Sequence, residues 1–341
     1  MAEKAGIWKA RSFFNSLILI ILIVPLFFGC GRSEKKAEDE AAPKGLILGF
    51  SQIGAESAWR TCNTRSVQEA AANSGIQLVF TNAEQKQENQ IKAIRSFIAY
   101  QVDVIAFVPI VADGWDNVLK EAQDAGIPVL ITDRKIHTAD ESLYAGFIGT
   151  DSLEEGRAGA RFLISKFKKK MQANGKPRII RILEISGTEG SSVAIGRAEG
   201  FREGLLDHPE FQITESISGD FLKSKGYEIM RGFEKSEWQF DAVFSHNDGM
   251  TLGMIEAMHE KGMRPGKDVV IVTIDAEQAA IDALRRGEVN CVIECNPKIG
   301  PAIMDLARKM AAGLPIPKQL HVNEQVFTED DDLAAIEDRG Y

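Results

Sequence analysis

Apolar and polar positions alternate along the chain in two regular series of short buried segments and amphipathic segments. In the first series, consecutive apolar residues, typical of strands buried on both faces, are predicted to form strands at residues 46–50, 76–80, 104–108 and 128–132. Between these strands, apolar residues at helical spacing predict helices at 58–73, 87–100 and 115–125. Gly75, Gly126 and Pro128 stand at the joins, where helix ends and turns are expected.

A second series repeats this alternation in the rest of the chain. Its predicted strands are 179–185, 211–217, 242–245, 269–274 and 290–294. Its predicted helices are 153–171, 193–207, 224–235, 250–261 and 278–286. Apolar strands that alternate with helices predict parallel sheets covered on both faces. The two series therefore predict two doubly wound α/β domains.

Residues 1–44 follow a different pattern. Three basic residues precede an apolar run at 17–28, and Cys30 follows the run after a single glycine. This order predicts a secretory signal peptide over 1–29 with a lipoprotein-type cleavage site, and acylation of Cys30. The polar, mixed-charge stretch 30–44 is predicted to be a disordered tether. The alternative is a retained N-terminal membrane helix in which Cys30 has no role.

Composition narrows the classes of partner. The formal net charge of −9 disfavours nucleic acid, and an export signal occupies the place where a repressor would carry its DNA-binding helices. After Cys30 only Cys62, Cys291 and Cys295 remain. Four residues of strand span roughly 13 Å, too far for a disulfide between Cys291 and Cys295. The five histidines show no metal-binding spacing. We expect an exported, lipid-anchored monomer in the periplasm or at the outer cell surface, without cofactor or metal.

Polar residues follow most of the predicted strands. They are Ser51-Gln52, Asp133-Arg134, Ser186 to Thr188, His246 to Asp248, Asp275 and Glu294. Any one of them alone is equally consistent with a helix cap or a turn. In open parallel sheets, however, ligands bind beyond the carboxyl ends of the strands. Polar strand ends in both domains therefore predict a common cleft.

Several longer motifs occur in a fixed order along the chain. They lie at 49–53, 56–60, 85–91, 131–134, 219–221, 244–248 and 340–341. In these motifs the chain, from residue 45 to 341, resembles the type I periplasmic sugar-binding proteins of ABC importers, and within them the galactofuranose-binding branch.

The resemblance implies two similar lobes that close on a sugar. It places three crossover strands near Gly149, Cys295 and Val322. The implied N-terminal lobe is 45–148 plus 296–322, and the implied C-terminal lobe is 149–295 plus 323–341.

The resemblance also implies a set of ligand contacts. They are Gln52, Glu56, Trp59, Arg60, Asp133, Arg134, Arg197, Phe221, Asn247, Asp275 and Glu294. Carboxylates and guanidinium groups suit sugar hydroxyls, and aromatic faces suit the apolar side of the ring. Taken singly, Trp59 and Phe221 are also consistent with core packing, and Arg197 with a solvated helix position.

Sugar identity is expected to depend on the first-lobe set Gln52, Glu56, Trp59 and Arg60. A long donor at Arg60 favours a sugar with an exocyclic arm, so a galactofuranose-like hexose is expected to bind in preference to ribose.

The predicted function is a substrate-binding lipoprotein that delivers a monosaccharide to an ABC permease. The alternative is a receptor that passes the ligand state to a chemoreceptor or sensor kinase. An enzyme is disfavoured because the chain shows no nucleophile elbow, and the loop 187–190 lacks the lysine of a phosphate-binding loop.

Overall fold

The computed structural model describes residues 45–174, 178–234 and 238–341. The signal peptide, Cys30 and the tether predicted from the sequence lie outside the described residues. Within the described ranges, no helix combines the length and the apolar character needed to cross a membrane.

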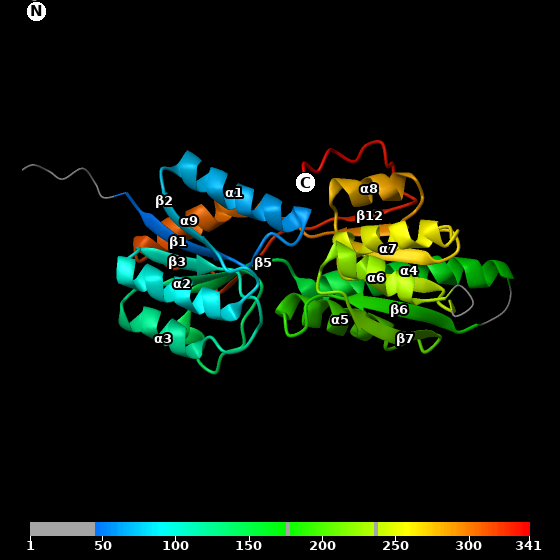
Figure 1. Cartoon of the computed structure of the whole chain (residues 1–341), viewed down its shortest axis with the longest axis horizontal. Coiled ribbons are helices and arrows are strands. Elements are labelled where there is room, and N and C mark those ends of the chain that lie inside the picture. Colours follow the sequence, from blue (N-terminus) through cyan, green and yellow to red (C-terminus); the bar gives the residue numbers. More distant parts are fainter. Residues whose placement is uncertain (1–44, 175–177, 235–237) are drawn as a thin grey trace, which may run out of the picture. The chain divides into compact units, whose positions relative to one another are not determined.

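The first sheet has six parallel strands in the order β11-β5-β4-β3-β1-β2. These strands are β1 (Ile47–Gln52), β2 (Gln77–Asn82), β3 (Val104–Phe107), β4 (Val129–Asp133), β5 (Gly146–Gly149) and β11 (Gln319–His321). Helices α1 (Ala58–Ser74) and α9 (Gly300–Ala311) pack on one face of the sheet. Helices α2 (Gln87–Tyr100) and α3 (Asp116–Asp124) pack on the other, and a short 3₁₀ helix η1 (Glu141–Leu143) follows β4 (Figure 1).

The second sheet has six strands in the order β12-β10-β9-β8-β6-β7. These strands are β6 (Ile180–Ser186), β7 (Phe211–Ser218), β8 (Ala242–Ser245), β9 (Val270–Asp275), β10 (Cys291–Glu294) and β12 (Val326–Thr328). All pairings in this sheet are parallel except β12 with β10, which is antiparallel. Helices α4 (Ser152–Asn174) and α5 (Ser192–Leu205) pack on one face. Helices α6 (Lys223–Gly232), α7 (Asp248–Glu260) and α8 (Gln278–Arg285) pack on the other.

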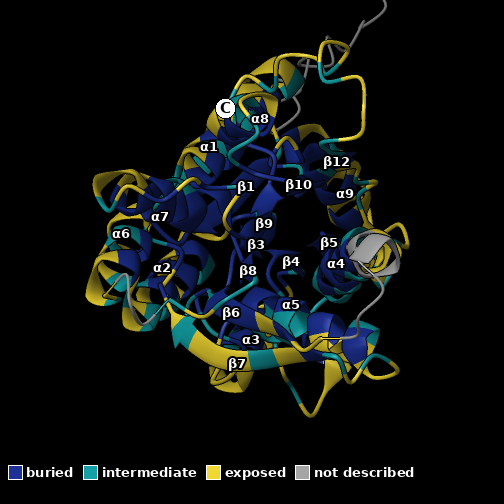
Figure 2. Ribbon diagram, turned by 90° about the vertical axis from the view of Figure 1, so that its right-hand side faces the viewer, coloured by how far each residue is buried: buried dark blue, intermediate teal, exposed yellow. Residues whose placement is uncertain are grey.

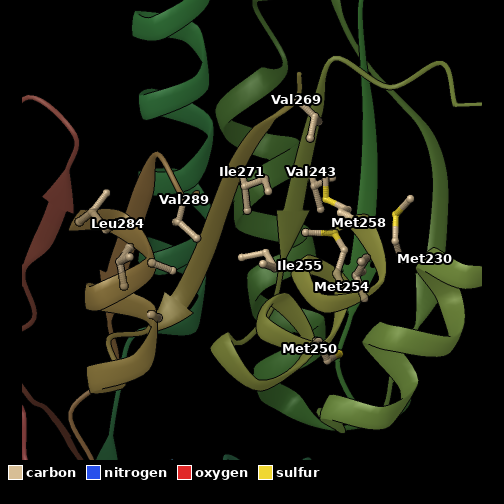
Figure 3. Close-up of a cluster of buried hydrophobic side chains, with 14 of the residues drawn as sticks. Met230, Val243, Met250, Met254, Ile255, Met258, Val269, Ile271, Leu284 and Val289 are labelled. Carbon is tan, nitrogen blue, oxygen red and sulfur yellow. The ribbon is translucent and has the colours of Figure 1, made fainter. Parts of the chain in front are cut away.

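The central strands of both sheets are buried, whereas the edge strand β7 is largely exposed (Figure 2). On the α7 face of the second sheet, methionines fill much of the core. Met250, Met254 and Met258 project from α7 and meet strand residues such as Val243 and Ile271 (Figure 3). Methionine suits this place because its unbranched side chain fills irregular gaps.

The chain passes between the two sheets three times, at 150–151, 295–299 and 322–325. The predicted fold of two doubly wound α/β domains is confirmed. Sequence periodicity did not identify β5, α9, β11 or β12. Strands β11 and β12 have three residues each, too few to show a repeat, and the antiparallel direction of β12 depends on the third passage. The exact lobe boundaries remain a prediction.

Candidate functional site

A small cavity, of about 30 Å³, lies where carboxyl ends of strands from both sheets meet. Its lining is Glu56, Ser57, Trp59, Arg60, Asp133, Arg134, Val193, Arg197, Phe221, Asn247, Asp275 and Cys295. Nine of the eleven residues predicted as ligand contacts are among this lining.

The structure does not bring Gln52 and Glu294 into the lining. Gln52 ends β1, but its side-chain amide donates to Asn63 Oδ1 at 3.0 Å. The Gln52 side chain therefore contacts α1. Glu294 ends β10, and its carboxylate accepts from the amide of Gln325 at 3.0 Å and pairs with Arg339. Polar residues at strand ends lie at the binding edge of a sheet, but some of them hydrogen-bond to a neighbouring helix or crossover instead of facing the cavity.

The first turn of α1 forms one wall of the cavity. Ser57 caps the helix, because its hydroxyl accepts from the amide of Arg60 at 3.0 Å. Trp59 is 5% exposed, and its indole N–H donates to the carbonyl of Cys295 at 2.5 Å. The guanidinium carbon of Arg60 lies 4.6 Å from the Trp59 ring centroid. Trp59 therefore lines the cavity and also packs against the second passage.

Arg60 is the centre of a buried ion network in the first lobe. Its Nε lies 3.0 Å from Glu56 Oε1, and its Nη2 lies 2.7 Å from Asp133 Oδ2. Burial lowers the pKa of Arg60, but Asp133 and Glu56 outweigh burial and the net pKa is raised. Burial likewise raises the pKa of Glu56, but Arg60 and Arg134 outweigh it and the net pKa is lowered. Both groups are therefore charged at neutral pH.

Arg134 lies beside this network. Its Nη1 donates to the carbonyl of Ile110 at 3.1 Å, and its Nη2 lies 4.0 Å from Glu56. The pKa of Arg134 is lowered to about 10, mainly by burial and secondly by the charge of Arg60. Arg134 therefore still carries a positive charge at neutral pH.

Arg197 is the corresponding cation of the second lobe. Its Nε donates to Glu155 Oε2 at 2.6 Å, a second nitrogen donates to the carbonyl of His246, and Nη2 lies 3.7 Å from Asp275 Oδ1. Burial lowers its pKa, but Glu155 and other neighbouring groups outweigh burial and the net pKa is raised. Arg197 is only 2% exposed, so the alternative of a solvated helix arginine is wrong.

Phe221 forms the aromatic wall of the second lobe. A Cβ at Gly187 would lie 1.9 Å from its Cζ, so only glycine leaves space for this ring. The guanidinium carbons of Arg134 and Arg197 lie 5.3 and 5.9 Å from the ring centroid. Asn247 caps α7 by accepting from the amide of Met250, and its NH₂ group donates to the carbonyl of Phe221 at 3.3 Å.

Three cavity residues have positive φ although none is glycine. Asp133 has φ 63°, Phe221 has φ 60° and Asp275 has φ 131°. Such backbone costs on the order of 1–3 kcal/mol per residue and concentrates at functional sites. Such backbone persists only where the surrounding structure holds it.

Sequence reasoning missed four residues of the site. Ser57, Val193 and Cys295 line the cavity, and Glu155 in the first turn of α4 pairs with Arg197. Cys295 directly follows a strand, which was a usable signal, whereas Glu155 becomes visible only through the packing of α4 against α5.

Glu155, Cys295 and Glu324 form the one group of potential metal ligands among the described residues, with ligand atoms within 4.8 Å of one another. Burial raises the pKa of the Cys295 thiol. Burial, and next the charge of Glu155, raise the pKa of Glu324 to about 10. Both groups hold protons at neutral pH, and a metal would have to displace them.

Two α/β sheets joined by three passages, with a polar cavity at their facing strand ends, define the architecture of a type I periplasmic binding protein. Residues 48–315 match the periplasmic binding protein domain family, and the chain belongs to this family. The galactofuranose-binding protein YtfQ of Escherichia coli K12 is 39% identical over 308 residues, which cover 88% of this chain and 94% of that protein.

Two solved structures are similar over most of their length. A Mycobacterium smegmatis protein in complex with β-D-fucofuranose is 44% identical with a TM-score of 0.82, covering 87% of this chain and 96% of that one. The periplasmic binding protein component of the arabinose ABC transporter from Shewanella sp. ANA-3, bound to α- and β-L-arabinofuranose, is 41% identical. Its TM-score is 0.79, and the match covers 85% of this chain and 93% of that one. The resemblance inferred from the motifs is confirmed.

Proposed function

We propose that the protein is the substrate-binding component of an ABC sugar importer and that it binds a neutral monosaccharide in the cavity. The observation that carries this proposal is the balance of the lining, which sets three carboxyl groups against three arginines beside two aromatic rings. Carboxylates accept hydrogen bonds and guanidinium groups donate them, so together they match hydroxyls that do both. Charged groups of both signs line the cavity, although burial raises the pKa of Asp275. A ligand with no net charge suits such a lining better than an anion or a cation.

The ligand is proposed to be a sugar in furanose form, with a galactofuranose-like hexose favoured. The three similar proteins are named for galactofuranose or were solved with fucofuranose or arabinofuranose. Arg60 Nη1 and Glu56 Oε2 are buried without a hydrogen-bond partner, which makes them a donor and an acceptor for a sugar. Their place beside Trp59 suits the exocyclic arm of a hexofuranose, which ribose lacks in its pyranose form.

The conformation described here is proposed to be the closed one. Several hydrogen bonds join residues of opposite lobes. The amide of Ala112 donates to Gly190 O at 3.0 Å, that of Lys135 to Ser192 Oγ at 2.7 Å, and that of Trp59 to Glu277 Oε1 at 3.0 Å. We propose that the lobes, 45–148 plus 296–322 and 149–295 plus 323–341, open by hinge motion at the three passages.

The sugar is proposed to leave the protein chemically unchanged. The hydroxyl of Ser57 is engaged in capping α1, and burial keeps the Cys295 thiol protonated. The ring of His246 does not line the cavity, and its Nε2 lies 3.3 Å from Glu184. No activated nucleophile therefore faces the cavity within the described residues.

We also propose that the protein is exported and tethered to a membrane. The signal over 1–29 would direct export, an acylated Cys30 would anchor the protein to a membrane, and an ABC permease would receive the sugar. The monomeric state is part of the same proposal. No observation favours the sensory-receptor alternative, whereas one of the similar structures is named as an arabinose transporter component.

A thermal-shift screen of furanosides, pyranoses and charged metabolites tests the proposed function. A ligand at 100 times its dissociation constant should stabilise the protein by about 2.7 kcal/mol, which is a measurable shift. Methyl β-D-galactofuranoside should give a larger shift than ribose. A shift with anions but with no sugar would reject the proposal.

A further inference from the structure

Tyr341 contacts both ends of the turn that follows β9. Its hydroxyl donates to the main-chain carbonyl of Asp275 at 3.0 Å. Its own main-chain oxygen accepts from the amide of Gln278, the first residue of α8, at 2.6 Å. Tyr341 does not line the cavity, but Asp275, the residue that it holds, does.

The turn that Tyr341 holds is strained. Asp275 and the next residue, Ala276, have φ of 131° and 64°. Backbone of this kind persists at non-glycine residues only where the surroundings hold it. Two further contacts hold the turn: the amide of Cys295 donates to Asp275 O at 3.2 Å, and the amide of Glu277 donates to Asp248 Oδ2 at 2.7 Å.

The residues just before Tyr341 are fastened to the first-lobe side of the molecule. The guanidinium of Arg65 in α1 donates to the carbonyl of Gly340 at 2.9 Å. The ammonium of Lys298, which precedes α9, donates to the carbonyl of Arg339 at 2.6 Å. Segment 339–341 therefore has attachments to α1 and to the start of α9 in addition to those it makes with the turn and with Gln278.

We propose that Tyr341 is a positioning residue for ligand binding, which acts by bracing the strained turn so that the Asp275 carboxyl group faces the cavity. This inference rests on the proposed sugar-binding function. The Tyr341 hydroxyl has no part in contacting the sugar. The Tyr341 hydroxyl affects affinity only by fixing the position of Asp275.

The test is isothermal titration of methyl β-D-galactofuranoside into the purified wild type, Tyr341→Phe, Asp275→Asn and the double variant. Loss of one neutral hydrogen bond should weaken binding of Tyr341→Phe by about 3- to 10-fold. In the Asp275→Asn background the same change should alter affinity by less than about 1.5-fold, because coupled residues are not additive. Tyr227→Phe is the matched control, since the Tyr227 hydroxyl contacts Glu260 and not the turn.

Hydrogen exchange of the ligand-free proteins provides a measurement that needs no sugar. The amides of Glu277 and Cys295 should exchange faster in Tyr341→Phe than in wild type or Tyr227→Phe. If wild type binds no furanoside, the proposed function fails, and the exchange rates alone decide whether Tyr341 braces the turn. Two results would show that the inference is wrong, provided that the wild type binds the furanoside. One is that Tyr341→Phe has the same affinity as Tyr227→Phe. The other is that Tyr341→Phe lowers the affinity by the same factor in the wild-type and the Asp275→Asn backgrounds.

Discussion

Replacing Arg60 by methionine should harm the ligand-free protein as well as sugar binding. Methionine has a similar length and no charge, so the substitution removes the ion pairs at 3.0 Å to Glu56 and 2.7 Å to Asp133 with little change in volume. Removing one partner of a buried ion pair costs about 3–5 kcal/mol, because the remaining charge is left uncompensated. Arg134, 4.0 Å from Glu56, offsets part of that cost.

The loss of stability in Arg60→Met should be larger at pH 7 than at pH 5. In the wild type the pKa of Glu56 is below its ordinary value of 4.5, so its stabilising contribution is present above that pH and is lost as the pH falls. Without Arg60, burial is less opposed and the pKa of Glu56 should rise. The variant then gains stability as the pH falls, so the deficit relative to wild type should shrink between pH 7 and pH 5.

Chemical denaturation at pH 7 and pH 5 measures both effects, and Arg95→Met provides the control. Arg95 of α2 pairs with Glu121 at 2.8 Å on the surface, where solvent screens the pair and it contributes little to stability. Loss of a hydrogen bond from a charged group, about 1.5–3 kcal/mol, should also weaken furanoside binding by Arg60→Met roughly 10- to 100-fold. The reasoning is refuted if Arg60→Met denatures like Arg95→Met at pH 7, or if its deficit is larger at pH 5.

Two further predictions concern Glu324 and Cys30. The pKa of Glu324 is raised to about 10 by burial and next by the charge of Glu155, so the folded protein binds a proton that the unfolded chain releases. Its contribution to stability is therefore greatest below pH 4.5 and falls as the pH rises toward 10. Glu324→Gln should be more stable than wild type at pH 8 and equal at pH 4 by urea denaturation, and a gain that is the same at both pH values would contradict this. Cys30→Ser should fail to incorporate labelled fatty acid in cells, and equal labelling of both proteins would exclude acylation at this cysteine.

The fold was largely predictable because it depends on local pattern. Buried parallel strands produce continuous apolar segments, and the helices between them show clear periodicity. The passages between sheets were less visible, because β11 and β12 are too short for a pattern. Only the resemblance to a known family indicated their positions.

The site was predictable where a residue ends a strand or begins a helix that faces the cavity. Asp133 and Asp275 followed from the rule that strand ends converge. Gln52 also ends a strand, but its side chain donates to Asn63 of α1 and does not line the cavity. The partners of the arginines could not be predicted, because the contact of Arg60 with Asp133 depends on how α1 packs across the end of β4.

The most direct test of the central claim is a crystal structure of the protein grown with methyl β-D-galactofuranoside. The sugar should occupy the cavity between Trp59 and Phe221, with hydrogen bonds to Arg60 from the first lobe and to Arg197 and Asp275 from the second. A sugar bound elsewhere on the protein, or one that contacts a single lobe, would contradict the account.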